Sequence, residues 1–209
     1  MIKERGKKMK LTHNRKLEIA IGVSFIIATI CYASGSSMVA GALSNPLVNL
    51  SALSIGVLLE IGNSIAVIAL GVLFLERLKN KNRTLVIGYA ITRAIEAVLL
   101  MVGSVVTLFA LKSSSGETLE GLFVLHEAFF SVAMLVLGIY STLFFVYLFK
   151  ESVGPKWLMG LGVLGYLMTS IYALIMIGSG LTINPLILFA PGGIFEILLP
   201  LWLIFKGFE

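Results

Sequence analysis

The sequence predicts an all-α, polytopic membrane protein, a bundle of six transmembrane helices with the N- and C-termini cytoplasmic. Hydrophobic residues make up 58% of the 209 residues and charged residues only 13%, whereas an ordinary soluble domain is about 25% charged. The apolar residues form continuous runs that reach or exceed the ~20 residues of a transmembrane helix. A transmembrane β-barrel would instead show segments of about ten residues with alternating polarity.

The first half of the chain supplies a tail and three of these helices. Residues 1–16, "MIKERGKKMKLTHNRK", are expected to form a basic cytoplasmic tail, and residues 17–206 a single transmembrane domain. The first run exceeds the 7–15 apolar residues of a cleaved signal peptide, so we interpret it as a helix. The turn-forming stretches "GALSNPLVN" and "KNKNR" end the first and second helices. These three helices are predicted at about 17–40, 50–77 and 84–111.

The second half repeats this organisation. The polar stretch "KSSSGETLE" follows the third helix, "ESVGPK" the fourth and "LTINPL" the fifth. Their Gly, Pro, Asn and Ser residues favour turns, and their shortness makes consecutive helices antiparallel neighbours. The last three helices are predicted at about 121–149, 157–180 and 186–206.

The basic residues predict the orientation. Fourteen of the sixteen Lys and Arg lie in the tail, in the connections after the second and fourth helices, or at the C-terminus, all on one side. Basic loops remain cytoplasmic, so the expected location is the cytoplasmic membrane, with lipids as neighbours. Because these charges lie at helix ends rather than on one binding surface, no nucleic-acid partner is predicted.

Ionisable and amide side chains also fall inside the apolar runs. Arg93 and Glu96 are close to the middle of the third helix, and an ionised group there costs ~2.5–3.5 kcal/mol. Such groups usually face a bundle interior or a wet cavity. The second, third and sixth helices are therefore expected to bring their charges into one cluster, which the fourth closes on the outer side. The candidates for ligand or proton binding are Glu60, Asn63, Arg93, Glu96, His126, Glu127 and Glu196.

Two interpretations of the cluster remain open. Arg93 and Glu96 lie one turn apart and can neutralise each other as a structural clasp. The remaining glutamates, however, leave two excess negative charges when His126 is protonated and three when it is neutral. Such an excess requires protonated carboxyls, an entering cation or water, which favours a functional site. His126 among glutamates has metal-ligand chemistry, but no metal-site spacing accompanies it, and neither a metal nor a cofactor is predicted.

The sixth helix has an unusual composition before its glutamate. Pro191, Gly192 and Gly193 precede Glu196 in "FAPGGIFEILLP". Pro removes a backbone donor and Gly loosens a helix, so the segment is compatible with a helix interrupted beside a binding site. It is equally compatible with a helix that simply begins at Pro191.

Several stretches resemble the bacterial membrane proteins grouped as domain of unknown function 4386. They are "NRKLEIAIGVSFIIAT" (14–29), "LLEIGNSIAVIALGVLF" (58–74), "GYAITRAIEAVLLMVG" (88–103), "PKWLMGLGVLGY" (155–166) and "EILLPLWLIFKGF" (196–208). The resemblance implies an all-helical membrane protein with Glu, Arg–Glu and Glu in helices two, three and six, here Glu60, Arg93, Glu96 and Glu196. It does not extend to His126 and Glu127, and it implies no activity.

Three function classes fit these features. The leading hypothesis is an integral membrane protein that binds or transports a small solute, a proton or a cation through an outward-opening cavity. An alternative is an intramembrane enzyme that acts on a lipid or peptide, with glutamates and His126 as acid-base groups. A third is a structural subunit of a membrane complex. The oligomeric state cannot be derived from the sequence.

Overall fold

The computed structural model describes residues 12–44, 49–111, 116–178 and 185–208. Within these ranges the chain is a six-helix bundle without strands, each helix long and apolar enough to cross a membrane. The predicted all-α, multi-pass membrane fold is therefore confirmed. The helices are α1 His13–Leu43, α2 Leu50–Leu78, α3 Arg83–Thr107, α4 Gly116–Lys150, α5 Lys156–Gly178 and α6 Pro185–Phe205, with a 3₁₀ turn η1 Leu108–Leu111 after α3.

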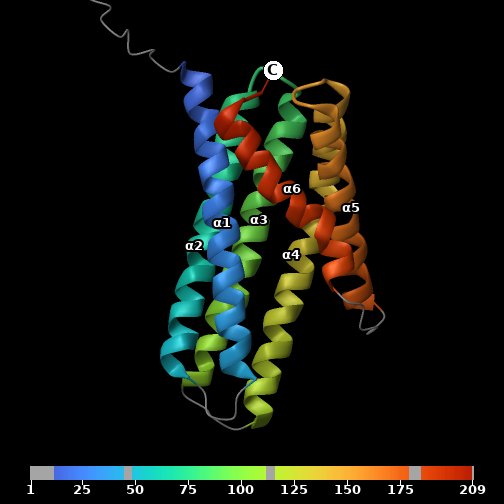
Figure 1. Cartoon of the computed structure of the whole chain (residues 1–209). Coiled ribbons are helices and arrows are strands. Elements are labelled where there is room, and N and C mark those ends of the chain that lie inside the picture. The colour runs from blue at the N-terminus through green and yellow to red at the C-terminus, as the bar shows by residue number, and fades with distance from the viewer. Residues whose placement is uncertain (1–11, 45–48, 112–115, 179–184, 209) are drawn as a thin grey trace, which may run out of the picture.

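The helices form a ring in chain order (Figure 1). Each packs against its sequence neighbours, and α6 returns to pack against α1, so the first and last helices close the ring. Contact between α1 and α4 is slight by comparison. The start of α1 and the end of α6 lie at the same end of the bundle (Figure 1), which we call the terminal end. At the other end α1 to α4 extend beyond α5 and α6.

Polar caps set three of the helix starts. The side chains of Thr12, Asn49 and Asn82 accept hydrogen bonds from backbone N–H groups three residues later, in the first turns of α1, α2 and α3. These N–H groups have no partner within the helix, so a side-chain oxygen satisfies them. Because Thr12 caps it, α1 begins at His13, within the stretch assigned to the tail and before the predicted start at 17.

Neither interpretation of α6 was correct. The helix runs without interruption from Pro185 to Phe205 and contains Pro191 and Pro200 in its interior. Close packing around this part of α6 requires a glycine on the facing helix. A Cβ on Gly165 of α5 would lie 2.6 Å from the Cα of Gly192, so the α5 and α6 backbones approach as only small residues allow.

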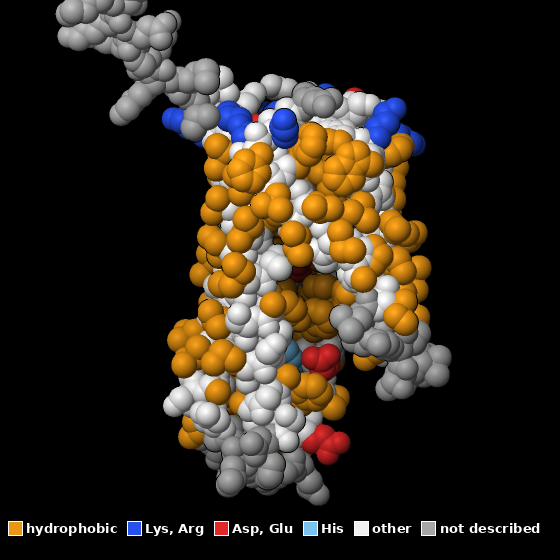
Figure 2. Space-filling model, in the orientation of Figure 1, with side chains coloured by type: hydrophobic (Ala, Val, Ile, Leu, Met, Phe, Trp, Pro, Cys, Tyr) orange, Lys and Arg blue, Asp and Glu red, His pale blue; other side chains and the backbone are white. Residues whose placement is uncertain are grey.

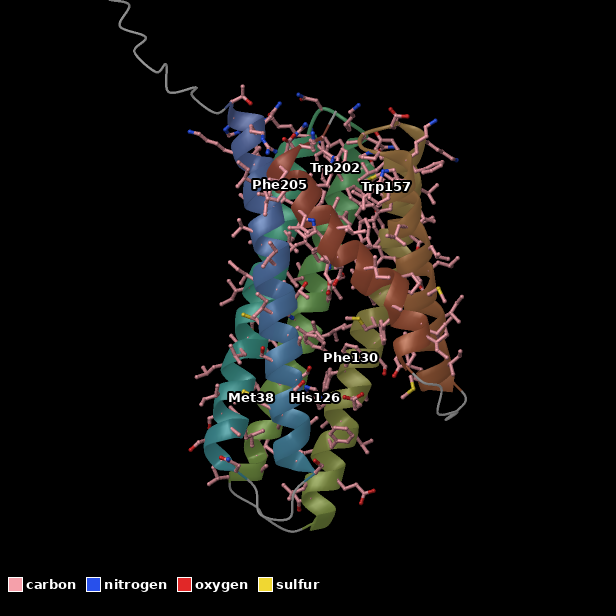
Figure 3. The ribbon with its side chains drawn as sticks, in the orientation of Figure 1. Met38, His126, Phe130, Trp157, Trp202 and Phe205 are labelled. Atoms are coloured by element: carbon pink, nitrogen blue, oxygen red, sulfur yellow. The ribbon has the colours of Figure 1, made fainter. Side chains whose placement is uncertain are left out.

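The outer surface and the interior differ as expected in a bilayer. Figure 2 shows hydrophobic side chains over the sides of the bundle and Lys and Arg at the terminal end. Trp157 and Trp202 lie near that end (Figure 3), and Trp is typical of the membrane–water interface. Inside, Phe74, Tyr89 and Phe144 contact one another edge-on or stacked, with ring centroids 4.1 to 5.7 Å apart.

A charged contact that sequence reasoning did not select stabilises the terminal end. Glu18 of α1 is buried and accepts hydrogen bonds from Arg77 of α2 at 2.7 and 2.8 Å. Arg15 lies 3.5 Å from the same carboxylate and also donates to the backbone carbonyls of Leu203 and Ile204 in α6. Carbonyls in the last turn of a helix lack intrahelical partners, so Arg15 both caps α6 and joins it to α1.

Candidate functional site

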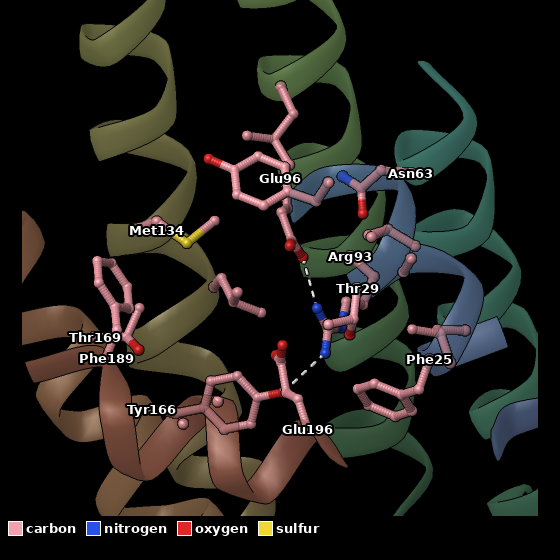
Figure 4. Close-up of a pocket in the computed structure, with 18 of the residues that line it drawn as sticks. Phe25, Thr29, Asn63, Arg93, Glu96, Met134, Tyr166, Thr169, Phe189 and Glu196 are labelled. Carbon is pink, nitrogen blue, oxygen red and sulfur yellow. Dashed lines mark hydrogen bonds and ion pairs between the residues drawn. The ribbon is translucent and has the colours of Figure 1, made fainter. Parts of the chain in front are cut away.

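A cavity of about 280 Å³ lies inside the ring at mid-height. Its walls come from all six helices and are mostly aromatic and aliphatic, with polar groups gathered on one side (Figure 4). In Figure 2 the bundle surface is hollowed at this height, so the cavity is open on one flank. The polar or charged lining residues are Thr29, Tyr32, Asn63, Arg93, Glu96, Tyr166, Thr169 and Glu196.

Arg93 is the centre of the polar side. Its side chain is 2% exposed, and all three guanidinium nitrogens have partners. One Nη donates to Glu96 Oε2 at 2.9 Å, the other to the Tyr166 hydroxyl at 3.0 Å, and Nε to the Tyr89 hydroxyl at 2.9 Å. The rings of Phe25, Tyr89 and Tyr166 lie 5.2 to 5.9 Å from Cζ, a distance at which ring faces stabilise a cation. The guanidinium is therefore rigidly held.

Glu196 lies beside this network without an ion pair of its own. The Tyr166 hydroxyl donates to Glu196 Oε1 at 3.3 Å, and Figure 4 shows the carboxylate directed into the cavity near Arg93. Among the described residues no Lys, Arg or His lies within ion-pair distance of Glu196. Arg93, Glu96 and Glu196 together carry one excess negative charge when ionised.

A second group of ionisable side chains lies toward the end opposite the termini. Glu60 Oε2 accepts a hydrogen bond from Ser104 Oγ at 2.5 Å and lies 3.1 Å from His126 Nε2. At the second nitrogen of the imidazole, His126 Nδ1 lies 3.5 Å from Glu127 Oε1. A space of about 10 Å³ beside Glu60 and His126 shares Tyr32, among other residues, with the wall of the large cavity.

The seven candidates from the sequence thus form two adjacent groups rather than the single expected cluster. Arg93, Glu96, Glu196 and Asn63 line the large cavity, and Glu60, His126 and Glu127 form the second group. The division arises because the aromatic side chains of Tyr32 and Phe130 and the side chain of Leu100 stand between them. All seven remain on the inner side of the ring, although Glu127 is partly exposed.

Sequence reasoning did not select three polar partners. Tyr89 and Tyr166 hold Arg93, and Ser104 holds Glu60. Tyr89 lies four residues before Arg93, and Ser104 lies eight after Glu96, so both share the helix face of the predicted charges. This shared helix face was the sequence signal that could have identified Tyr89 and Ser104. Tyr166 offered a weaker one, because it lies on a polar stripe of α5 but far from any charge in the sequence.

The chemistry open to these groups is that of charge and proton binding. No group of three or more His, Cys or Glu side chains in the described ranges is arranged to hold a metal ion. The single proton of the Ser104 hydroxyl has Glu60 and the Leu100 carbonyl as acceptors, and the hydroxyl makes no hydrogen bond with His126, so this serine is not activated by the histidine in the manner of hydrolases. In both groups, neighbouring side chains position carboxylates through hydrogen bonds.

Most of the chain matches a known family. The family described as a domain of unknown function, DUF4386, matches residues 20–207. The chain belongs to this family. Every residue of the two groups lies within the DUF4386 match, which also spans the greater part of the bundle. No match was found among curated proteins or among solved structures. DUF4386 thus names the fold unit and leaves its function to be argued from the site.

Proposed function

We propose that the protein binds a small solute carrying a cationic group in the large cavity, with Glu196 as its counter-ion. The observation that carries this proposal is the Glu196 carboxylate, which lies on the cavity wall with a single hydrogen bond from Tyr166 and no ion pair in the described part of the chain. Arg93 forms no ion pair with it, because its guanidinium nitrogens are bonded to Glu96, Tyr89 and Tyr166, and its single charge is already matched by Glu96.

Charge balance favours a cation over other ligands. An uncompensated carboxylate in a low-dielectric interior is costly, and a bound ammonium group would offset that cost. The aromatic walls add to this preference, because ring faces attract ammonium groups. Phe25, Tyr32, Phe130, Tyr166 and Phe189 all contribute to the cavity lining. An anionic solute would have to compete with Glu96 for Arg93 and would lie close to Glu196.

The remaining walls indicate an apolar body on the same solute. Apart from the polar side, the cavity is lined by residues such as Ala28, Val67, Leu70, Met134 and Leu137. The opening seen in Figure 2 lies on the flank of the bundle among hydrophobic side chains. An amphiphilic molecule that partitions into the bilayer could enter there. The proposed ligand class is therefore a small hydrophobic amine.

Thermal unfolding in detergent tests the proposal with phenethylammonium and its neutral analogue 2-phenylethanol. A ligand that binds the folded state raises Tm with concentration. We expect phenethylammonium to raise the Tm of the wild-type protein more than the alcohol does, and Glu196→Gln to remove the difference. Glu151→Gln, which changes an exposed glutamate at the terminal end, should retain it. Equal effects of the two compounds on the wild type would contradict a cation site.

We further propose that the terminal end is cytoplasmic in a bacterial inner membrane. Support comes from the fourteen Lys and Arg on that side of the chain and from Trp157 and Trp202 near that end. Cysteine labelling tests it in a Cys31→Ser background. A membrane-impermeant maleimide added to intact cells should label Glu120→Cys, at the start of α4, and leave Asn80→Cys, between α2 and α3, unlabelled. Labelling of Asn80→Cys without cell lysis would reverse the topology.

A further inference from the structure

His126 has a carboxylate facing each of its two ring nitrogens. Nε2 lies 3.1 Å from Glu60 Oε2, and Nδ1 lies 3.5 Å from Glu127 Oε1. A neutral imidazole carries one N–H and can donate to one of these oxygens, leaving the lone pair of its other nitrogen facing the second carboxylate. An imidazolium carries two N–H groups and presents one to each carboxylate, although Nδ1 lies at ion-pair distance from Glu127 and forms no hydrogen bond with it. The arrangement therefore matches the ring with a proton on each nitrogen.

Glu60 has an acceptor to spare. Ser104 and His126 both lie within hydrogen-bond distance of Oε2, whereas Oε1 is buried without a hydrogen-bond partner in the described part of the chain. A buried, unpartnered carboxylate oxygen is costly, and a proton on that carboxyl would reduce the cost. The adjoining space of about 10 Å³ is close to the smallest volume that holds a water molecule.

We propose that Glu60, His126 and Glu127 form a proton-binding site, which loads from the solution at the end opposite the termini. The site is separate from the proposed solute cavity and does not depend on it. The titratable groups that face His126 are Glu60 from α2, Glu127 from α4 and Tyr32 from α1, and Tyr172 of α5 lies near Glu127.

Burial increases stepwise along the three side chains. Glu127 is 39% exposed, His126 8% and Glu60 2%, and Figure 3 shows His126 in the lower half of the bundle between α1 and α4. The ring is an imidazolium at rest; when it is transiently neutral, with its proton on Nε2, a proton taken up by Glu127 can pass to Nδ1. The imidazolium so formed can release its Nε2 proton to Glu60, which leaves a neutral ring with the proton on Nδ1. The net result moves one proton from the surface to Glu60.

The site adjoins the solute cavity through aromatic residues. Phe130 lies one helical turn after His126, stacks on Tyr32 with centroids 5.6 Å apart, and lies 6.1 Å from the ring of Phe189 in α6. All three aromatic residues line the large cavity. If a proton on His126 changes how α4 packs against α1, it changes this wall, and binding at the two sites then becomes reciprocally linked.

Nitrogen NMR of ¹⁵N-histidine-labelled protein in detergent tests the site directly. The sequence contains two histidines, and replacing the exposed His13 by Asn leaves the His126 ring as the sole side-chain signal. At neutral pH we expect both ring nitrogens to carry a proton. Glu60→Gln and Glu127→Gln should each increase the neutral fraction, whereas Glu120→Gln, an exposed glutamate on the same helix, should not. Chemical shifts of the neutral ring in the unaltered site at neutral pH would overturn the proposal.

The same spectra separate a proton from a metal cation. We expect identical ring signals in sodium and in choline buffers of equal pH and ionic strength. Loss of one ring proton on addition of sodium would show that the carboxylates hold a metal cation instead, and would refute the proton site. Both measurements use the site with its three side chains intact, so they remain decisive even if the glutamine variants fold poorly.

Discussion

Replacing Arg93 by Leu is expected to cost about 3–5 kcal/mol of folding free energy, the value for removing one partner of a buried ion pair. The change leaves Glu96 buried without its cation at 2.9 Å and removes the donors to the Tyr89 and Tyr166 hydroxyls. It also removes the positive charge nearest to Glu196 (Figure 4). The measurement is the unfolding midpoint in a mild detergent, compared with that of the wild-type protein.

The double variant Arg93→Leu/Glu96→Leu is the informative control. Replacing both partners of a buried pair by apolar residues is often neutral or stabilising, so we expect it to recover much of the stability that the single change loses. Phenethylammonium should nevertheless bind it less selectively, because Tyr166, which donates to Glu196, loses the guanidinium that holds its hydroxyl in place. A double variant as unstable as Arg93→Leu alone would show that Arg93 acts through the tyrosines rather than through Glu96.

Gly165→Ala is expected to have the second-largest effect. The added Cβ would lie 2.6 Å from Gly192 Cα and 2.8 Å from Gly192 N, and backbone atoms cannot move aside as a side-chain end can. The α5 and α6 helices must then separate, at a cost of about 1–3 kcal/mol for overpacking. Because α6 carries Glu196, we also expect the ammonium-dependent rise in Tm to diminish.

Gly160→Ala is the matched control on the same helix. A Cβ there would meet only the Phe149 ring, at 3.7 Å, which is ordinary contact. Alanine is a better helix former than glycine by about 1 kcal/mol, so this variant should be as stable as the wild type or more so. If both alanine variants behave alike, the close approach of α5 and α6 does not limit stability.

The transmembrane helices were predictable because the bilayer imposes one requirement on all of them. A span needs about 20 apolar residues with its backbone bonded internally, and each run met that condition. Helix starts were less predictable, since a single capping side chain such as Thr12 can extend a helix by a turn. The prediction at Pro191 was wrong because the effect of a proline within a helix depends on the residues that pack around it. Inside a bundle, packing against Gly165 supports a helix that the local sequence alone would not.

The candidate site was predictable in its residues and less so in its grouping. The spacing of Arg93 and Glu96 places them on one helix face, but whether Glu60 joins them depends on the register between α2 and α3. The hydrogen bond from Ser104 shows that Glu60 lies level with Ser104 rather than with Glu96. This register is a long-range property, set where α2 and α3 approach so closely that a Cβ added to Gly71 would lie 3.1 to 3.2 Å from Arg93 and Ala90, and helical periodicity within one segment cannot supply it.

The closure of the ring by its first and last helices has a consequence for biosynthesis. Arg15 of α1 completes its hydrogen bonds only with the carbonyls of Leu203 and Ile204, so the bundle cannot close until α6 has been synthesised. Until then the nascent chain is an open intermediate, in which Glu18 and the surfaces that α6 will cover are not yet enclosed. A chain that stops before α6 would keep this open form permanently and present buried charges to the proteases that clear unassembled membrane proteins.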